Sequence, residues 1–74
     1  MNIEHLVSMA NDISRFFDGE YGTKESPPNI ATHITRFWDP RMRTQIIAYV
    51  AQDGSGLTPT ALAAVKTLTP PPAR

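Results

Sequence analysis

Near the middle of the chain, residues 37–43 read Phe37-Trp38-Asp39-Pro40-Arg41-Met42-Arg43. This stretch predicts an elbow between two helices, because a residue that precedes proline is pushed out of the α region. A helix that contains Phe37 and Trp38 must therefore end at Asp39. Proline is favoured at the first position of a helix, and the Asp39 carboxylate can accept hydrogen bonds from the backbone amides that follow. We expect Asp39 and Pro40 to make the turn, with Phe37, Trp38 and Met42 packed at the elbow.

Two helices are predicted before the elbow. Asn2 can cap the first, along which apolar residues recur at helical spacing as far as Gly19, a natural C-terminal stop. Residues 19–27 contain Gly, Ser and Pro and predict a polar loop. The second helix then begins at Pro28 or Asn29. One face of it carries four apolar residues: Ile30, Ile34, Phe37 and Trp38.

Two more helices are predicted after the elbow. The third begins at Pro40 and is closed by the stretch 53–56, and its inward face carries Met42, Ile46, Tyr49 and Val50. The fourth begins with Thr58 as its cap and Pro59 as its first residue, and its apolar face continues to Leu68. No strand pattern competes. We therefore predict an all-α bundle of three to four helices over residues 1–68, followed by a flexible, extended Pro-rich tail at 69–74.

Size and composition predict a small domain that depends on a partner. A chain of 74 residues buries only about 60% of its unfolded surface, so its fold is marginal alone. Leu, Ile, Val and Phe make up about 22% of the residues, near the lower edge for a globular core. The absence of cysteine excludes disulfides, thiolate-bound zinc and iron–sulfur clusters. Good helix packing or docking on another protein remains as the source of stability.

The formal net charge is zero, but the charges are unevenly distributed. Residues 1–25 carry five acidic and two basic side chains, and residues 26–74 carry the reverse. This balance lacks the basic excess that is typical of nucleic-acid-binding domains. No signal peptide pattern and no apolar run of the length that spans a bilayer is present. We therefore expect a cytoplasmic protein that binds neither nucleic acid nor membrane.

Patterns typical of catalysis or metal binding are missing from the sequence. His5 and His33 lie on different predicted helices without cysteine or paired acidic partners, whereas a zinc site needs three or four convergent ligands. No serine lies in a Gly-x-Ser-x-Gly motif, and the glycines near residue 55 are not followed by the Gly-Lys-Ser/Thr of a phosphate loop. We expect no catalytic, cofactor-binding or metal-binding residue in this chain.

Candidates for contact with a partner are five residues: Trp38, Arg41, Arg43, Ile47 and Phe16. Trp and Arg are the residue types most enriched at interface hot spots. On a helical wheel Arg41 points away from the predicted inward face, and Ile47 lies roughly 120° from it. Other interpretations stay open, in which the arginines are solvated, Arg43 stacks on Trp38, and Phe16 belongs to the core.

Several motifs together indicate a family resemblance. They are Met9-Ala10-Asn11, Phe16-Phe17, Ile30-Ala31-x-His33, Arg36-Phe37-Trp38-Asp39-Pro40-Arg41-Met42-Arg43 and Leu57-x-Pro59…Ala64-Val65. In this order and spacing, over residues 3–66, the chain resembles the delta subunit of cytoplasmic NAD-dependent formate dehydrogenases. The stretch 18–28 and the Pro-rich tail carry no signature of that family.

The resemblance implies an accessory subunit that is not itself an enzyme and that binds the catalytic subunit of the complex. It implies a molybdenum or tungsten pterin, iron–sulfur clusters, FMN and NAD in the complex, none of them bound by this chain. The composition agrees on one point. Without cysteine, the chain can neither ligate an iron–sulfur cluster nor carry sulfur to a molybdenum cofactor as a persulfide.

We therefore expect a non-catalytic subunit that supports assembly or stability by docking on the catalytic subunit. Two alternatives stay open. One is a transient assembly factor that binds cofactor phosphates through its arginines. The other, ranked lower, is a small helical domain that binds nucleic acid. The sequence does not decide whether the isolated chain self-associates, whether the subunit stays in the mature complex, or whether the Pro-rich tail becomes ordered.

Overall fold

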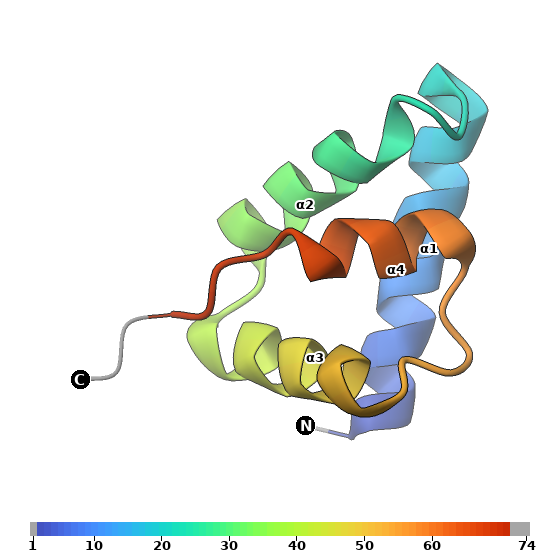
Figure 1. Cartoon of the computed structure of the whole chain (residues 1–74). Coiled ribbons are helices and arrows are strands. Elements are labelled where there is room, and N and C mark those ends of the chain that lie inside the picture. The colour runs from blue at the N-terminus through green and yellow to red at the C-terminus, as the bar shows by residue number, and fades with distance from the viewer. Residues whose placement is uncertain (1, 72–74) are drawn as a thin grey trace.

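The computed structural model describes residues 2–71, which form four helices joined by short loops (Figure 1). The helices are α1 (Ile3–Tyr21), α2 (Ser26–Phe37), α3 (Pro40–Gln52) and α4 (Pro59–Lys66). No strand occurs in the described part of the chain, so the predicted all-α fold is confirmed. None of these helices combines the length and the apolar character needed to cross a membrane.

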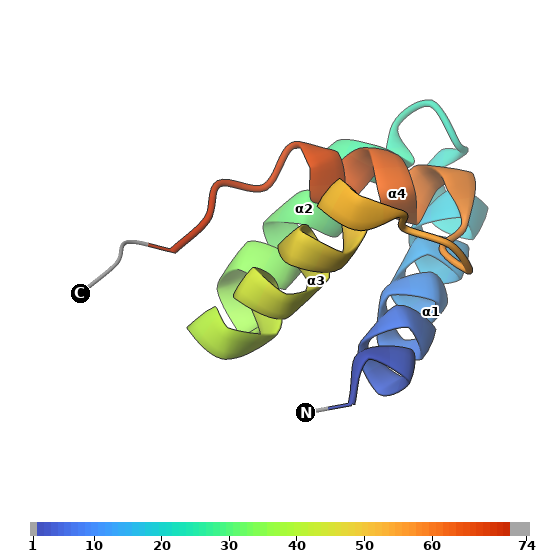
Figure 2. The ribbon, with the colours of Figure 1, turned by 60° about the horizontal axis from the view of Figure 1, so that its bottom comes forward.

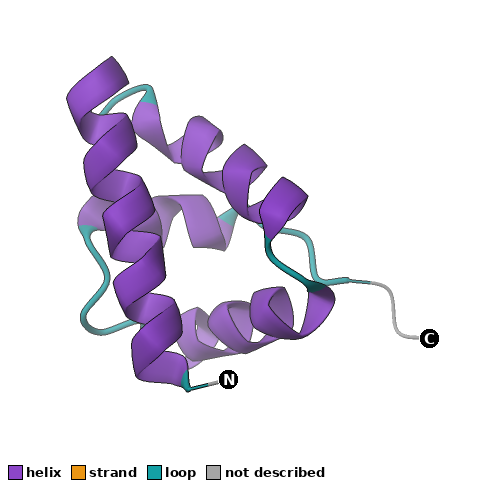
Figure 3. Cartoon of the chain, turned by 180° about the vertical axis from the view of Figure 1, so that it is seen from behind, coloured by secondary structure: helices purple, strands orange, loops and turns teal. Residues whose placement is uncertain are grey.

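The first three helices outline a triangle (Figure 1), and the fourth lies across one face of it (Figure 2). Seen from behind, α2 starts beside one end of α1 and α3 finishes beside the other end (Figure 3). Both α1 and α4 pack against all three of the other helices. The elbow at residues 38–39 joins α2 to α3. A core therefore forms where α4 closes the triangle.

Local capping explains where three of the helices begin. The Asn2 side chain accepts a hydrogen bond from the Glu4 amide at 2.7 Å, which starts α1. Asp39 Oδ1 accepts from the Met42 amide at 3.0 Å, and Pro40 follows as the first residue of α3. Thr58 Oγ1 accepts from the Ala61 amide at 3.2 Å, with Pro59 as the first residue of α4. All three predicted starts are confirmed, because each depends on groups within one helical turn.

Three predicted helix boundaries are wrong. α1 continues through Gly19 to Tyr21, and the stop is Gly22, whose φ of 83° lies in the region that favours glycine. α2 begins at Ser26, earlier than predicted, because its two prolines fall within the first turn, where no amide hydrogen is needed. The loop between α1 and α2 is thus shorter than the predicted 19–27. α4 ends at Lys66, although Leu68 still packs against the core.

The Pro-rich end of the chain is described only in part. Residues 68–71 follow α4 without regular secondary structure, and Pro71 is half-buried. Residues 72–74, the remainder of the predicted tail, lie outside the described residues. The division into a helical domain at 1–68 and a flexible tail at 69–74 stays a prediction.

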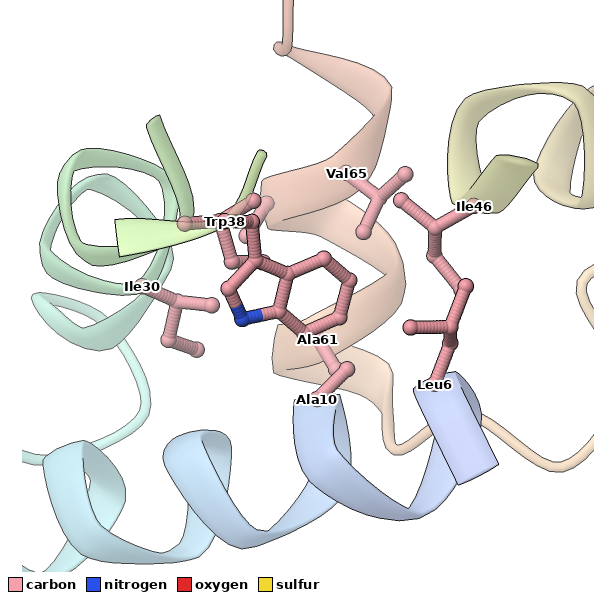
Figure 4. Packing of buried hydrophobic residues seen from close by; sticks show 9 residues of the cluster. Leu6, Ala10, Ile30, Trp38, Ile46, Ala61 and Val65 are labelled. Atoms are coloured by element: carbon pink, nitrogen blue, oxygen red, sulfur yellow. The ribbon is translucent and has the colours of Figure 1, made fainter. Parts of the chain in front are cut away.

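The hydrophobic core is built around the indole of Trp38. Figure 4 shows the indole at the centre of the buried cluster, with Ile30 on one side and Val65 and Ile46 on the other. Ala10 of α1 and Ala61 of α4 lie next to the ring in the same view. Both alanines are fully buried. Their small side chains leave room for an indole between two closely packed helices. The other buried members of the cluster are Leu6, Ile34 and Ala64.

A polar clamp holds the loop between α3 and α4 against α1. The side-chain amide of Asn11 donates to the Gly56 carbonyl at 2.8 Å, and its oxygen accepts from the Thr58 amide at 2.9 Å. The Ser14 hydroxyl lies 2.6 Å from the Thr58 hydroxyl. Asn11 and Ser14 are buried, so these bonds satisfy groups that water cannot reach. The clamp places the start of α4 at a fixed position along α1.

Candidate functional site

The elbow places two adjacent aromatic residues in opposite environments. Trp38 is 4% exposed and Phe37 is 71% exposed. Trp38 is thus mostly buried, and its role as a partner contact stays a prediction, whereas the exposure of Phe37 contradicts its predicted packing at the elbow. The reason is helical spacing: Trp38 follows Ile30 and Ile34 at intervals of four and shares their buried face. Phe37 falls beside His33 instead, with 4.8 Å between the ring centroids.

Phe37 belongs to a continuous row of aromatic rings across α1 and α2. We call this row the aromatic stripe, and its members are Phe16, Phe17, Tyr21, His33 and Phe37. The centroid distances between neighbouring rings are 5.2 Å for Phe16–Phe17, 5.9 Å for Phe17–Tyr21, 6.1 Å for Phe17–His33 and 4.8 Å for His33–Phe37. These are contact distances for aromatic pairs, so the rings position one another.

The aromatic stripe carries the large hydrophobic residues that are exposed among residues 2–71. Phe16 is 60% exposed and Tyr21 is 55% exposed, and together with Phe37 they are the exposed large hydrophobic residues of the described chain. Phe17 and His33 are half-buried and link them. Single exposed apolar residues are ordinary, but a contiguous exposed group marks an interaction site more often than chance.

A hollow of about 350 Å³ lies beside the stripe, between α1, the end of α2 and the start of α3. We call it the groove, and it is lined by Met9, Asp12, Ile13, His33, Phe37, Trp38 and Met42. Most of these side chains are apolar, and the two methionines are flexible and polarisable. The groove and the aromatic stripe share His33 and Phe37, so they form one continuous surface. Three of the predicted elbow residues, Phe37, Trp38 and Met42, line this groove, and Met42 is half-buried.

Arg43 has a structural role in the elbow. Its Nη1 donates to the Trp38 carbonyl at 2.5 Å and to the Thr35 carbonyl at 3.4 Å. These carbonyls belong to the last turn of α2, where backbone acceptors lack partners and a cation is favoured by the helix dipole. Arg43 therefore stabilises the end of α2 by donating to the Thr35 and Trp38 carbonyls. This contact is to the backbone of Trp38, whereas the sequence had suggested stacking on its ring.

Arg41 and Arg43 lie on different parts of the surface. Arg41 is exposed at the start of α3. Arg43 and Arg36 line a different hollow of about 450 Å³ between α2 and the segment that follows α4. Threonines from both sides also line it: Thr32, Thr35, Thr67 and Thr69. Arg43 therefore shares a hollow with Arg36, and Arg41 does not line it.

The remaining predicted contacts lie on separate surfaces. Ile47 is half-buried and packs against the core, and it lines a hollow of about 240 Å³ with Val50, Val65 and Leu68. Phe16 is part of the aromatic stripe and does not line this hollow. The five predicted partner residues therefore do not form one site. Phe16 and the exposed Arg41 keep the accessibility that a partner contact requires.

No cluster of three or more His, Cys, Asp and Glu side chains that could hold a metal ion occurs among residues 2–71. His33 lies between two phenylalanine rings, as part of the aromatic stripe. Three of the buried polar side chains, Asn11, Ser14 and Thr60, make hydrogen bonds that join separate parts of the fold.

Sequence reasoning missed most of this surface. Tyr21 and His33 were outside the predicted partner contacts, Phe37 was assigned to the packing of the elbow, and Asp12 carried no role. Two signals were present. α1 carries a second apolar row beside its core-facing row, and His33 and Phe37 are four residues apart on α2, which places them side by side. Their meeting with α1 depends on how the two helices cross.

The comparisons with known proteins are informative at the level of the family. The sequence profile of a family described as NADH-dependent formate dehydrogenase delta subunit FdsD matches residues 5–65. The matched range begins in α1 and ends one residue before the end of α4, so it includes the aromatic stripe and the groove. Searches of curated proteins and of solved structures gave no match.

Proposed function

The chain belongs to the FdsD family, the delta subunits of NADH-dependent formate dehydrogenase, and from this premise we propose that it is a non-catalytic accessory subunit. It supports assembly or stability of the complex by docking on the catalytic subunit. The observation that carries the proposal is the continuous aromatic stripe with its adjoining groove. Such a surface is costly for a free domain, because its rings stay in contact with water.

The size of the domain supports the same proposal. A chain of this length without disulfides has few means of stabilisation beyond its core and a partner. Burial of the exposed rings against another subunit would add apolar contact that the isolated fold lacks. Aromatic residues are among the types enriched at interface cores, so Phe16, Tyr21 and Phe37 are suitable anchors.

The side chains available as cluster ligands support a role in which this chain carries out no redox chemistry. An iron–sulfur cluster is held by cysteine thiolates, and this sequence has none, so the chain does not fit such a cluster. The proposal therefore assigns the pterin with molybdenum or tungsten, the iron–sulfur clusters, FMN and NAD to other subunits. The cytoplasmic location remains part of the proposal.

Co-expression tests this function. The catalytic subunit is produced with and without this chain, and the yield of soluble catalytic subunit and its elution on size exclusion are compared. We expect co-elution and a higher yield of assembled catalytic subunit when the chain is present. The isolated chain should show no formate oxidation. Separate elution of the two proteins, with equal yields in both cultures, would contradict the proposal.

A second candidate function has one specific observation in its favour. Arg36 and Arg43 line the same hollow with four threonines, a set of groups that suits phosphate oxygens. A transient assembly factor that binds the phosphates of the cofactor would use this hollow. Against it, Arg43 already donates to two backbone carbonyls. Calorimetric titration with pyrophosphate, compared between the natural chain and Arg36→Ala, tests it, and a stoichiometric place in the mature enzyme counts against it.

A further inference from the structure

We propose that the groove and the aromatic stripe receive an amphipathic helix of the catalytic subunit, and that this helix carries a basic side chain among its apolar ones. The inference rests on the proposed function, because it takes the catalytic subunit as the partner. It adds the surface that is used and the chemistry of the segment that occupies it. Three features of the molecule carry it: the apolar lining, the charges at the edge, and the length of the surface.

The floor of the groove is suited to apolar side chains of a partner. Met9 and Ile13 come from α1, Trp38 from the elbow and Met42 from α3, and all four contribute to the hollow of about 350 Å³. Methionine adapts its shape to what it contacts, and the edge of a buried indole gives a rigid base. Phe37 stands exposed at the rim. Large apolar side chains would bury both the floor and this ring.

The charges beside the groove favour a basic side chain in the partner. Asp12 lines the groove, and Asp12, Phe16 and Glu20 follow one another at intervals of four along α1, so they share one face. Both carboxylates are exposed. The faces of the aromatic rings attract cations in addition. An arginine or lysine placed over Phe16 would meet a carboxylate on either side of the ring.

The other charged groups near this surface do not cancel its acidic character. Arg15 pairs with Asp12 at 3.0 Å, but both groups are exposed, and such pairs are weak enough to exchange partners. Arg36 lies on α2 but lines the separate hollow beside residues 67–71. His33 is half-buried between Phe17 and Phe37. Carboxylates therefore dominate the rim on the α1 side.

The length of the surface matches a helix of the partner. From Met9 to Tyr21 the surface follows α1 over about 18 Å, at a rise of about 1.5 Å per residue. A partner helix of about three turns covers that distance, and helices placed in an apolar groove are a recurrent mode of recognition. A second copy of this chain suits the surface less well. In a twofold dimer built on α1, the carboxylates of one copy would face those of the other.

Photo-crosslinking tests the identity of the occupant in the co-expressed complex. A benzophenone amino acid replaces Phe37, and the crosslinked segment of the catalytic subunit is identified by mass spectrometry. We expect an amphipathic helical segment that contains at least one Arg or Lys. A crosslink to a loop, to a strand, or to another copy of this chain would overturn the inference. Absence of a crosslink in a complex that still co-elutes would overturn it as well.

Two variants with a matched control test the chemistry. The double variant Phe16→Ala/Phe37→Ala removes the exposed rings, and Asp12→Lys/Glu20→Lys reverses the rim charge. Asp53→Lys makes the same kind of charge change at an exposed position after α3, outside the groove. Circular dichroism first establishes that each variant is folded. We expect each double variant to weaken binding to the catalytic subunit by about tenfold or more, and Asp53→Lys by less than about twofold.

The outcomes separate the two proposals. If the natural chain does not bind the catalytic subunit, the proposed function itself fails. If the natural chain binds and both folded double variants bind equally well, only the groove is excluded. Binding of the natural chain should also weaken as salt concentration rises, and this dependence should be reduced in an Asp12→Asn/Glu20→Gln variant. An unchanged salt dependence in that variant would overturn the assignment of a basic partner side chain.

Discussion

Phe37 and Trp38 are neighbours in the chain and lie on opposite sides of the elbow, one 71% exposed and the other 4% exposed. The Trp38 indole fills the centre of the core, where Ala10 and Ala61 leave space for it (Figure 4). The Phe37 ring lies 4.8 Å from His33 and continues the aromatic stripe at the surface. One residue of helical rotation therefore separates the element that holds the fold together from the surface proposed to bind a partner.

This difference in burial predicts that two alanine substitutions will change stability by very different amounts. Trp38→Ala should lower the free energy of unfolding by about 3–5 kcal/mol, because it removes the largest side chain of the core and leaves a cavity. Phe37→Ala should change it by less than about 0.5 kcal/mol, because the ring is exposed. Urea unfolding followed by circular dichroism measures both. Trp38→Phe, which keeps an aromatic ring, should fall between them. Equal losses for Trp38→Ala and Phe37→Ala would contradict the burial described above.

Two glycines predict changes of opposite sign. Gly54 has φ of 73°, and a Cβ there would lie 2.8 Å from the Leu62 side chain, so Gly54→Ala should cost about 1–2 kcal/mol. Gly19 lies within α1, and a Cβ at this position would have no neighbouring atom within 4 Å, so Gly19→Ala should stabilise the chain by about 0.5–1 kcal/mol. Thermal unfolding of both variants provides the measurement. Destabilisation by Gly19→Ala would indicate that α1 ends before Tyr21.

The polar clamp predicts that substitution of Asn11 will lower the stability of the fold. Asn11→Ala removes two hydrogen bonds and leaves the Gly56 carbonyl and the Thr58 amide without their partner. The expected cost is about 2 kcal/mol. Asn29→Ala is the matched control, since its side chain makes one exposed bond to the Glu25 carbonyl, and it should cost about 0.5 kcal/mol. Similar values for the two variants would mean that the clamp does not fix α4.

The two arginines of the elbow should differ in how much they contribute to the stability of the fold. Arg43→Ala should lower the free energy of unfolding by about 1 kcal/mol, because the Trp38 and Thr35 carbonyls lose a cationic donor. Arg41→Ala should change it by less than about 0.5 kcal/mol, since Arg41 is exposed. Unfolding measurements and co-elution with the catalytic subunit are made on both variants. If Arg41→Ala leaves co-elution unchanged, Arg41 is removed from the predicted partner contacts.

Local chemistry made much of the fold predictable. The starts of α1, α3 and α4 each depend on a capping side chain and on residues within one turn of it, so they can be inferred without knowing what the helix packs against. The family could also be inferred from short motifs, and the match over residues 5–65 confirms that resemblance. The ends of α1 and α4 were less predictable, because a helix end depends on small differences between continuing the helix and turning.

The candidate surface was less predictable than the fold. Phe16 was one of the predicted partner contacts, and it lies on the aromatic stripe. Phe37 was expected to pack at the elbow and is exposed instead. Its exposure could not be inferred, because Phe37 and Trp38 both lie at the apolar side of α2 on a helical wheel and both residue types are common in cores and interfaces. Arg43 was predicted as an interface residue, and in the structure it stabilises the end of α2.

The sequence by itself determined where the chain turns and which helices it forms, since capping, proline geometry and helical spacing act over a few residues. Only the tertiary structure decided which aromatic side chains are buried. α4 lies across the triangle, held by the bond between Asn11 and Thr58, and that position selects the face of α2 that becomes the core. Trp38 lies on that face and Phe37 does not, because a residue's burial depends on what packs against it as well as on its own type.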